Sequence, residues 1–316
     1  MLLKIQNKKH AKLQKFMQIA SKILSLHAVN FLLKVKVLSD NNSIQALITE
    51  LKSEGNTIGM VPTMGALHYG HMSLVQKALS ENNWVVISIF VNPTQFNNSE
   101  DLEKYPRTLE RDLELLKTQS ENVLVYAPSV EEIYQGNTKA QDFDFDGLES
   151  EMEGMFRQGH FDGVGTVVKK LLEIVKPDNA YFGEKDFQQL MIIKRLVEKY
   201  KLPVNIVGCK IHRETNGLAM SSRNERLKPE YKTEAPFIYK TLMKAKRMFK
   251  SQSANSITKW VEKQFLNNKL LQLEYFVIAD IETLKQIKRK SSKRKYRAFI
   301  AAYAEDVRLI DNIALN

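Results

Sequence analysis

Short runs of apolar residues alternate with amphipathic segments along most of the chain. Apolar runs without polar alternation predict buried strands at residues 57–64, 84–91, 122–126, 180–182 and 204–209. Apolar positions at helical spacing predict helices near residues 44–51, 71–79, 109–116, 165–176 and 186–200. Strands that are apolar on both faces and interleaved with helices are typical of a mostly parallel sheet covered on both sides. The pattern therefore predicts an α/β fold.

The chain beyond residue 210 has a different pattern. Two helical stretches come before two strand-like runs, at residues 237–249, 257–266, 273–278 and 298–304. This order predicts a smaller C-terminal α+β domain. We therefore expect a basic leader, an α/β domain and a smaller second domain, at residues 1–34, 35–210 and 211–316.

Positive charge is concentrated at the start of the chain. The 316 residues carry a formal net charge of +11, yet residues 1–39 contain eight lysines and no acidic residue. Without these lysines, 39 basic residues face 36 acidic ones, so the remainder is nearly neutral. The basic run 285–297 is explained most simply as a solvated loop. The charge therefore gives little support to a nucleic-acid-binding protein.

The leader and the cysteine content bear on the cell compartment in which the protein resides. The leader lacks arginine, and its longest apolar cluster, residues 29–33, is too short for a secretory signal. A transit peptide, an over-extended start and a flexible basic arm are all compatible with it. No run approaches the ~18 apolar residues of a membrane span. The single cysteine, Cys209, excludes a disulfide scaffold, so a reducing compartment fits best.

The sequence VPTMGALHYGH at residues 61–71 takes a buried strand through a glycine-containing turn into a helix. His68 and His71 are therefore expected beside the exposed N–H groups of a helix N-terminus. Such an end carries partial positive charge and suits an anion such as a polyphosphate. At Gly70 a Cβ would obstruct a close ligand. Taken alone, the four residues are equally consistent with two surface histidines, and the strand–turn–helix context favours a site.

Three further junctions carry polar side chains. Gln95 follows an Asn-Pro break after a strand, although an ordinary turn explains that segment more simply. Lys185 stands directly before a helix, where its charge suits phosphate, and Asp186 beside it is a candidate N-cap. The segment GLAMSSRN, which contains Arg223, suits a mobile loop over phosphates as well as a plain surface turn. Ligands bind at such strand ends in parallel sheets.

Together these segments resemble the pantothenate synthetase, or pantoate–β-alanine ligase, family. Similar segments stand in family order over residues 35–312: VPTMGALHYGH, SIFVNPTQF, KYPRT, GHFDGV, KPDNAYFGEKDFQQL, GLAMSSRN and the terminal RLIDN. The resemblance implies a Rossmann-like, doubly wound fold of the nucleotidyltransferase type. It implies ATP-dependent condensation of (R)-pantoate with β-alanine to (R)-pantothenate, AMP and diphosphate, through a pantoyl-adenylate. It also implies Mg²⁺ and a homodimer. We expect a cytoplasmic location, with targeting to an organelle by the basic leader as the alternative.

The same resemblance assigns site residues. His71 is the implied proton donor, and His68, Lys185 and Arg223 join it as catalytic candidates. The positions implied to bind ATP are Met64, Gly65, His68, Gly70, His71, Gly183, Glu184, Lys185, Asp186, His212, Met220, Ser221, Ser222 and Arg223. The positions implied to bind pantoate or β-alanine are Met64, Asn92, Gln95, Arg157 and Gln189. No metal ligand is assigned.

The implied reaction requires positive charge, because the carboxylate of pantoate must attack a polyphosphate. Two like unit charges ~4 Å apart repel by about 4 kcal/mol at an effective dielectric constant of 20. We therefore expect a cationic cradle of Lys185, Arg223, His68, His71, a helix N-terminus and Mg²⁺. We also expect a hinged second domain to close over the water-sensitive adenylate.

The chain departs from the family pattern at two positions. Thr94 replaces a methionine that is usual beside Gln95, a change of size and polarity near the substrate. Arg111 replaces a usual acid before Asp112, which puts in doubt any metal or diphosphate contact from that helix. The leader and the basic run 285–297 are not family features either.

Two other functions compete with this interpretation. The nearer one is a different nucleotidyltransferase, which would share the His-x-Gly-His turn but not the FGEKDFQQL and NPTQF segments. The more distant one is a nucleic-acid-binding protein, supported only by the high isoelectric point and the two lysine-rich stretches. It predicts salt-dependent oligonucleotide binding that disappears with the leader.

Overall fold

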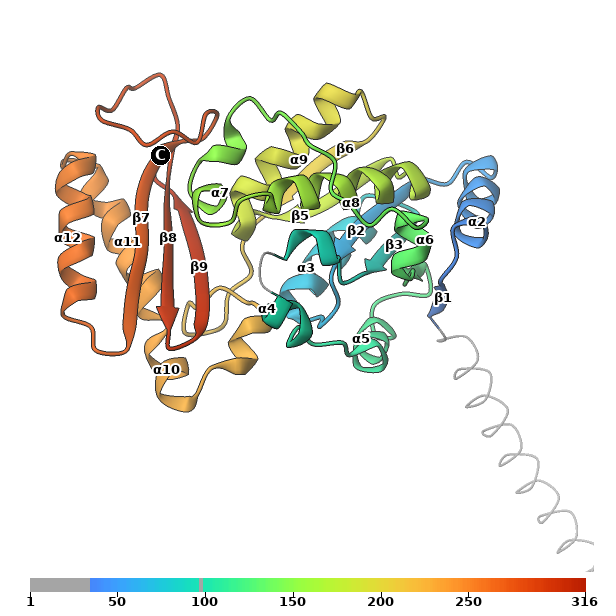
Figure 1. The fold of residues 1–316 in the computed structure, drawn as a ribbon, viewed down its shortest axis with the longest axis horizontal. Coiled ribbons are helices and arrows are strands. Elements are labelled where there is room, and N and C mark those ends of the chain that lie inside the picture. The colour runs from blue at the N-terminus through green and yellow to red at the C-terminus, as the bar shows by residue number, and fades with distance from the viewer. Residues whose placement is uncertain (1–34, 97–98) are drawn as a thin grey trace, which may run out of the picture.

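The computed structural model of the protein describes residues 35–96 and 99–316. The predicted leader, residues 1–34, lies outside the described residues. Two β-sheets lie side by side in the described part of the chain, one of six strands and one of three (Figure 1). This arrangement confirms the predicted α/β fold with a smaller C-terminal α+β part. The predicted domain boundary after residue 210 stays a prediction.

All strands of the larger sheet are parallel, in the order β1-β4-β3-β2-β5-β6. Their bounds are β1 (Lys36–Leu38), β2 (Ile58–Thr63), β3 (Trp84–Ile89), β4 (Val123–Tyr126), β5 (Asn179–Gly183) and β6 (Asn205–Cys209). From β2 the chain proceeds to β3 and β4 on one side, and from β5 to β6 on the other. The strand order therefore reverses between β2 and β5, the place where parallel sheets bind ligands.

Helices cover both faces of this sheet (Figure 1). Their bounds are α2 (Asn41–Ser53), α3 (Tyr69–Leu79), α4 (Ser99–Glu103), α5 (Leu109–Leu116), α6 (Val130–Tyr134), α7 (Glu153–Phe156), α8 (His160–Val175) and α9 (Phe187–Tyr200), with 3-10 turns η1 (Pro93–Gln95), η2 (Leu148–Ser150) and η3 (Glu184–Asp186). Met60 of β2 packs into the core beneath α2, α8 and α9, whereas the next residue, Val61, packs against α3 and α5. Because side chains alternate along a strand, both faces need apolar residues, which explains the uninterrupted apolar runs.

Helix α8 begins at His160, about one turn earlier than the sequence predicts. Its first turns contain Gly163 and Gly165, and glycine is a weak helix former. The structure shows why glycine is required at the first of these positions. A Cβ on Gly163 would lie 2.3 Å from the backbone oxygen of Thr94 in η1. The glycine thus allows α8 to lie directly against the segment that carries Gln95.

The smaller sheet is antiparallel, in the order β7-β8-β9. The bounds are β7 (Leu271–Asp280), β8 (Tyr296–Ala304) and β9 (Val307–Ala314), with α10 (Pro229–Glu234), α11 (Phe237–Phe249), α12 (Ala254–Leu266) and the 3-10 turn η4 (Ser222–Arg226). Leu242 of α11 and Val261 of α12 pack against Ile300 of β8 in a separate buried core. Strands β1 and β9 are absent from the sequence prediction.

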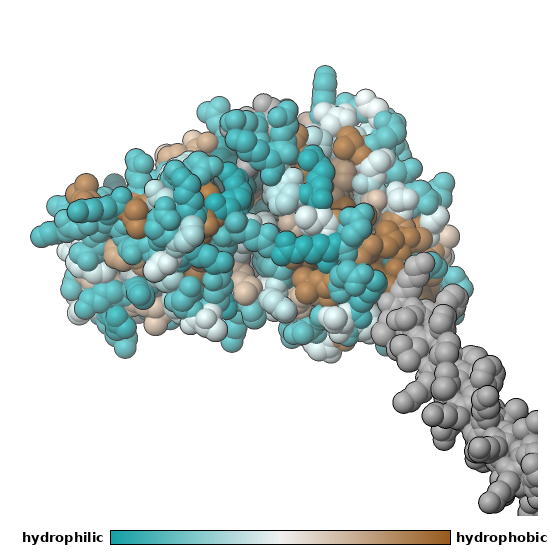
Figure 2. All heavy atoms as spheres, turned by 90° about the horizontal axis from the view of Figure 1, so that it is seen from below, coloured by the Kyte–Doolittle hydropathy of each residue, from teal (hydrophilic) through white to brown (hydrophobic). Residues whose placement is uncertain are grey.

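The predicted solvated loop, residues 285–297, ends in two residues that are buried in β8, Tyr296 and Arg297. Residues 285–295 are mostly exposed, as expected, but Arg297 lies within β8 with only 8% of its surface exposed. No helix in the described ranges, 35–96 and 99–316, has the length and apolar character needed to cross a bilayer. Figure 2 shows the underside of the molecule, where apolar side chains gather over the half with the larger sheet.

Candidate active site

A cavity of about 240 Å³ opens where the strands of the larger sheet end. Segments that follow β2, β3, β5 and β6 line it, together with α8. The predicted residues that line it are Met64, His68, Gly70, His71, Asn92, Gln95, Gly183, Lys185, Asp186, Gln189, His212, Met220, Ser221, Ser222 and Arg223. The structure therefore brings together four sequence segments that we selected separately.

A second cavity of about 480 Å³ continues from the first toward the smaller sheet. The residues common to both walls are Lys185, Asp186, Gln189, Ser221 and Arg223. Arg157 lines only the second cavity, and its guanidinium Nη2 lies 3.5 Å from the backbone oxygen of Gln95. Gly65 and Glu184 line neither cavity.

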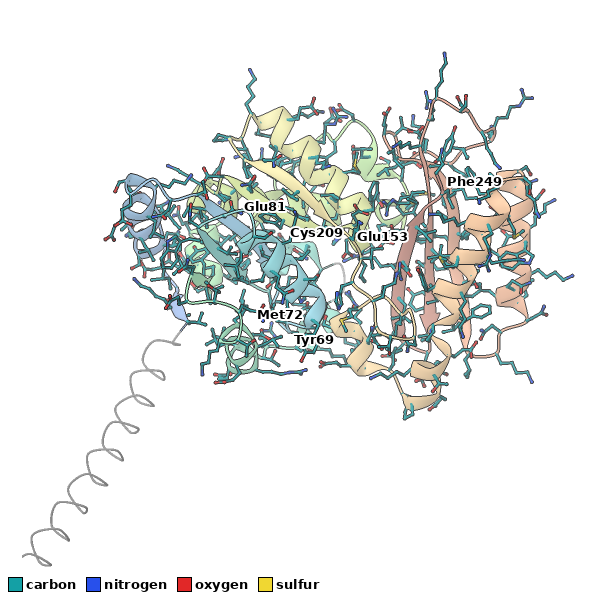
Figure 3. The ribbon with its side chains drawn as sticks, turned by 180° about the vertical axis from the view of Figure 1, so that it is seen from behind. Tyr69, Met72, Glu81, Glu153, Cys209 and Phe249 are labelled. Carbon is teal, nitrogen blue, oxygen red and sulfur yellow. The ribbon has the colours of Figure 1, made fainter. Side chains whose placement is uncertain are left out.

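The N-terminus of α3 is capped by two histidine rings. The Nδ1 atom of His68 accepts the N–H of Gly70 at 3.1 Å, and Nδ1 of His71 accepts the N–H of His68 at 3.2 Å. Two backbone N–H groups that we expected to face an anion are therefore occupied. In a neutral imidazole whose Nδ1 accepts, the hydrogen sits on Nε2. Both rings line the smaller cavity, so each can offer an Nε2–H donor. Figure 3 shows this end of the helix at Tyr69 and Met72.

Burial keeps these two rings neutral. It lowers the pKa of His71 to about 3, and repulsion from the Lys185 ammonium, and from His68 whenever that ring is protonated, acts in the same direction. Burial and the charge of Lys185 lower the pKa of His68 to about 4. The expected cationic cradle is therefore revised for the free protein. Its positive charge comes from Lys185 and Arg223, and the histidines contribute neutral donors.

Asp112 of α5 fixes the turn that leads into α3. Its carboxylate accepts the N–H groups of Ala66 at 3.0 Å and Leu67 at 2.8 Å, and Asp112 is 1% exposed. Gly65 and Ala66 both have positive φ, +81° and +49°, so the turn is a strained one that needs such support. Sequence analysis missed this role. The available signal was that Asp112 shares the buried side of its helix with Leu116.

Gln95 is oriented by its neighbours. Asn92 donates to Oε1 of Gln95 at 3.1 Å, and Nε2 of Gln95 donates to the sulfur of Met64 at 3.0 Å. The backbone oxygen of Gln95 accepts Nδ1–H of His160 at 2.8 Å. Burial lowers the pKa of His160 to about 4, so its ring is neutral too. His160 is a second contributor that sequence analysis missed.

Asp186 occupies the N-cap position of α9, as the sequence predicts. Its side chain makes no capping hydrogen bond at the start of α9, because the turn η3 precedes the helix. Its carboxylate lies 3.6 Å from the ammonium of Lys185. Asp186 thus moderates the charge of that lysine at the cavity wall and leaves the helix uncapped by a side chain.

The chain is similar in sequence to one family of known proteins. The model of the pantoate-beta-alanine ligase family matches residues 36–314. A pantothenate synthetase of Christiangramia forsetii is 57% identical over 282 residues, which are 89% of this chain and 100% of that protein. One of Flavobacterium psychrophilum is 56% identical, over 88% of this chain and 99% of its own length. The chain belongs to the pantoate–β-alanine ligase family.

Solved structures of this family have the same fold. Pantothenate synthetase from Thermus thermophilus superposes with a TM-score of 0.82 at 37% identity, over 89% of this chain and 99% of that one. Pantoate-beta-alanine ligase from Francisella tularensis, complexed with beta-gamma ATP and beta-alanine, gives a TM-score of 0.71 at 35% identity, over 89% and 98%. The chain is accordingly a ligase that condenses pantoate with β-alanine at the expense of ATP.

The two departures from the family pattern have local explanations. The hydroxyl of Thr94 lies 2.9 Å from the hydroxyl of Tyr134 and donates to Asn92 Oδ1 at 3.2 Å, and Thr94 lines neither cavity. Arg111 forms a two-point ion pair with Glu225 of η4, with distances of 3.1 and 2.7 Å. Arg111 thus links α5 to the segment that carries Arg223.

The described residues do not provide a Mg²⁺ cage. Among residues 35–96 and 99–316, no group of three or more His, Cys, Asp or Glu side chains could hold a metal ion. Asp112, the acid nearest the α3 turn, already accepts hydrogen bonds from two backbone N–H groups and from Thr108. The described side chains therefore do not fit a Mg²⁺ ion held by the protein alone.

The neutral histidines make stability depend on pH. Below its ordinary pKa of about 6.5, each of His68, His71 and His160 binds a proton in the unfolded chain, whereas the folded protein resists protonation down to about pH 3–4. The free energy of unfolding should therefore fall as the pH is lowered from 6.5 to 5. Each histidine contributes at most about 1.4 kcal/mol per pH unit. In His71→Asn, the free energy of unfolding measured by urea titration should fall less steeply as the pH is lowered from 6.5 to 5. The same pH dependence as in the unmodified protein would contradict a neutral, buried His71.

Proposed function

We propose that the reaction of this ligase takes place in the smaller cavity, at the carboxyl ends of β2 and β5. Pantoate is first joined to AMP, and β-alanine then displaces the nucleotide. The observation that carries the proposal is the convergence of four polar segments on one cavity, with two cationic side chains on the wall that it shares with the larger cavity. Residue roles follow from the chemistry of each group.

ATP is placed with its phosphates between the start of α3 and two other segments. Lys185 lies on η3, and Ser221–Arg223 lie at the start of η4, facing the same space. Lysine and arginine neutralise phosphate charge, and hydroxyl groups donate to its oxygens. The Nε2–H groups of His68 and His71 add neutral donors beside these cations.

Pantoate is placed against α8. Its two methyl groups suit an apolar wall, which Val164, Val167, Val168 and Leu171 provide at successive positions of that helix. Its hydroxyl groups and carboxylate suit the side-chain amides of Gln95 and Gln189, which line the same cavity. A cavity that is apolar on one side and amide-rich on the other distinguishes pantoate from a phosphorylated acceptor.

The first step forms a bond between a carboxylate oxygen of pantoate and the α-phosphorus of ATP. The bond from that phosphorus to the bridging oxygen of diphosphate breaks, and negative charge grows on the leaving oxygen. A donor aimed at this oxygen stabilises the transition state most, and we assign that donor to Nε2–H of His71. Because the ring is already neutral, His71 donates a hydrogen bond and does not act as a charged acid.

The second step forms the amide. The uncharged amine of β-alanine attacks the acyl carbon of the adenylate, the bond to the phosphate oxygen breaks, and AMP leaves while the amine loses a proton. Holding the amine close to the acyl carbon supplies most of the acceleration. The larger cavity, which meets the smaller one at Lys185 and Arg223, provides a route for this amine.

Three finer expectations belong to the same proposal. Mg²⁺ would accompany ATP as its counter-ion and would neutralise part of the phosphate charge beside Lys185 and Arg223. A homodimer is supported by the apolar side chains that gather on the underside of the larger-sheet half (Figure 2). We place the protein in the cytoplasm because its lone cysteine, Cys209, is unpaired.

Isotope exchange between ATP and diphosphate tests the order of the two steps. Labelled diphosphate should enter ATP when pantoate is present and β-alanine is absent, because formation of the adenylate is reversible. Exchange without pantoate would favour a different nucleotidyltransferase. Exchange that required β-alanine would overturn the two-step sequence.

His71→Ala removes the proposed donor to the leaving oxygen. We expect kcat to fall by roughly 10²–10⁴, the range for loss of an acid or an oxyanion donor. Pantoate-dependent exchange should fall with it, because the loss affects the first step. Turnover close to that of the unmodified protein would remove His71 from the mechanism.

Gln189→Ala should chiefly impair the use of pantoate. Gln189 is four residues beyond Lys185, about one helical turn, and shares the cavity with the apolar wall of α8. The KM for pantoate should therefore rise by about tenfold or more, while the KM for ATP changes little. Gln76→Ala, an exposed glutamine on α3, is the matched control. Unchanged pantoate kinetics in Gln189→Ala would contradict the placement.

A further inference from the structure

Strand β9 carries the terminal motif Arg308–Asn312, which has no role in the steps above. These residues line the larger cavity. Side chains alternate along a strand, so consecutive residues serve opposite faces of the small sheet. Leu309 and Ile313 pack with the core beneath α11 and α12, and Asp311 lies on their face. Asn312 lies on the other face, toward the larger sheet.

Asn312 holds the turn that carries Lys185. Its Nδ2 donates to the backbone oxygens of Glu184 and Lys185, both at 2.8 Å. These oxygens belong to the two peptide groups on either side of the Lys185 Cα atom. Asn312 is 1% exposed, so water does not compete for these bonds. A single carboxamide therefore fixes the backbone from which the phosphate-facing lysine projects.

Arg297 of β8 completes this connection. Its Nη1 donates to the Oδ1 atom of Asn312, and its Nη2 donates to the Glu184 carboxylate at 3.0 Å. The guanidinium also lies over the ring of Phe187, 4.0 Å from its centroid. Glu184, which the family resemblance assigned to ATP binding, thus faces the smaller sheet. With its oxygen and both of its amide hydrogens engaged, the carboxamide of Asn312 has one orientation.

Asp311 holds the second phosphate-facing segment through Arg213. Its carboxylate accepts Nη1 and Nη2 of Arg213 at 2.6 and 2.9 Å, and Asp311 is 5% exposed. Arg213 also donates to the backbone oxygen of Gly217 at 3.1 Å and stacks on Tyr239, 3.8 Å from the ring centroid. Buried two-point pairs of this kind fix geometry as well as charge.

The segment around Arg213 leads directly into Ser221–Arg223. The backbone of Arg213 bridges that of Ala219, and the N–H of Met220 donates to the oxygen of His212 at 3.0 Å. Gly217 has φ +95° and lies so close to Tyr239 that a Cβ would be 2.5 Å from its ring. The turn is therefore tight, and the ion pair between Arg213 and Asp311 fixes its position against β9.

We propose that Asp311 and Asn312 are positioning residues that set the spacing of the two phosphate-facing segments across the cleft. Asn312 places Lys185, and Asp311 places Ser221–Arg223 through Arg213. Two adjacent residues of one strand thus align both sides of the nucleotide site. This inference rests on the proposed placement of ATP, since it concerns how that same site is held. A displacement of about 1 Å at such groups can cost about 10²-fold in rate.

Calorimetric titration with a non-hydrolysable ATP analogue tests the role of Asn312. Asn312→Ala should weaken binding at least tenfold with an unchanged number of sites. A merely structural defect would reduce the number of binding-competent molecules and leave the dissociation constant unchanged, which would overturn the proposal. Asn316→Ala is the matched control, because the hydrogen bonds of the Asn316 side chain to residues of the described ranges go to the backbone of Tyr296 and Arg294, both in the small-sheet part. It should bind the analogue like the unmodified protein.

A double-mutant cycle with Lys185→Ala tests whether Asn312 acts through the lysine. In the Lys185→Ala background, Asn312→Ala should change the dissociation constant by less than about twofold. A full tenfold effect in that background would overturn this part of the proposal. Asp311→Asn keeps the size of the side chain and provides a second variant should Asn312→Ala not fold. It should also weaken analogue binding at least tenfold, and unchanged binding would overturn its role.

Pantoate-dependent exchange in the unmodified protein tests the proposed function separately from the positioning role of Asp311 and Asn312. Failure of exchange there would overturn the proposed function itself. Normal exchange, together with unaltered analogue binding in Asn312→Ala and Asp311→Asn, would overturn only the positioning role.

Discussion

The parallel pairing of β2 with β5 is the constraint on which the rest of this structure depends. Gly59 pairs with Asn179 and Met60 with Ala180, although about 120 residues separate these strands. Because the strand order reverses at this pair, the segments after both strands enter one open space. The histidines that cap α3 and the lysine of η3 meet there for that reason.

Burial decides which side chains of the site are charged and which are neutral. His68 and His71 are enclosed tightly enough to stay neutral, and each uses Nδ1 to cap a backbone N–H at the start of α3. The same geometry leaves the Nε2–H groups as fixed donors. In the proposed placement of ATP, Lys185 and Arg223, which line both cavities, supply the positive charge that the polyphosphate requires. Fixed neutral donors together with a few cations stabilise developing charge without reorganising during the reaction.

Contacts between the two sheets hold this arrangement. Glu153 of α7 accepts a two-point pair from Arg308 of β9 at 2.7 and 2.8 Å, and Figure 3 shows Glu153 at the boundary between the sheets. Asn312 bonds to the Lys185 turn from the same strand. Removing one partner of such a buried ion pair typically lowers the free energy of unfolding by about 3–5 kcal/mol. A hinged closure of the small sheet would have to preserve or replace these contacts.

Much of the fold could be predicted from the sequence, because buried parallel strands and amphipathic helices have distinct local patterns. The motif positions around His71, Lys185 and Arg223 could be selected for the same reason. The burial of Asp112 has a sequence signal, but its partners, and those of Asn312, do not. These partners lie about 45 and 127 residues away, and only the folded chain brings them together. Strand β1 has three residues, too few for a periodic signal.

The central claim concerns where the nucleotide lies, and a crystal structure with a non-hydrolysable ATP analogue and pantoate tests it most directly. The account predicts the phosphates at the carboxyl ends of β2 and β5, between the start of α3, Lys185 and Ser221–Arg223. Pantoate should lie against α8, in contact with Gln95 and Gln189. Phosphates bound only in the part of the larger cavity next to Arg308 and Tyr275, away from the β2–β5 edge, would contradict the account.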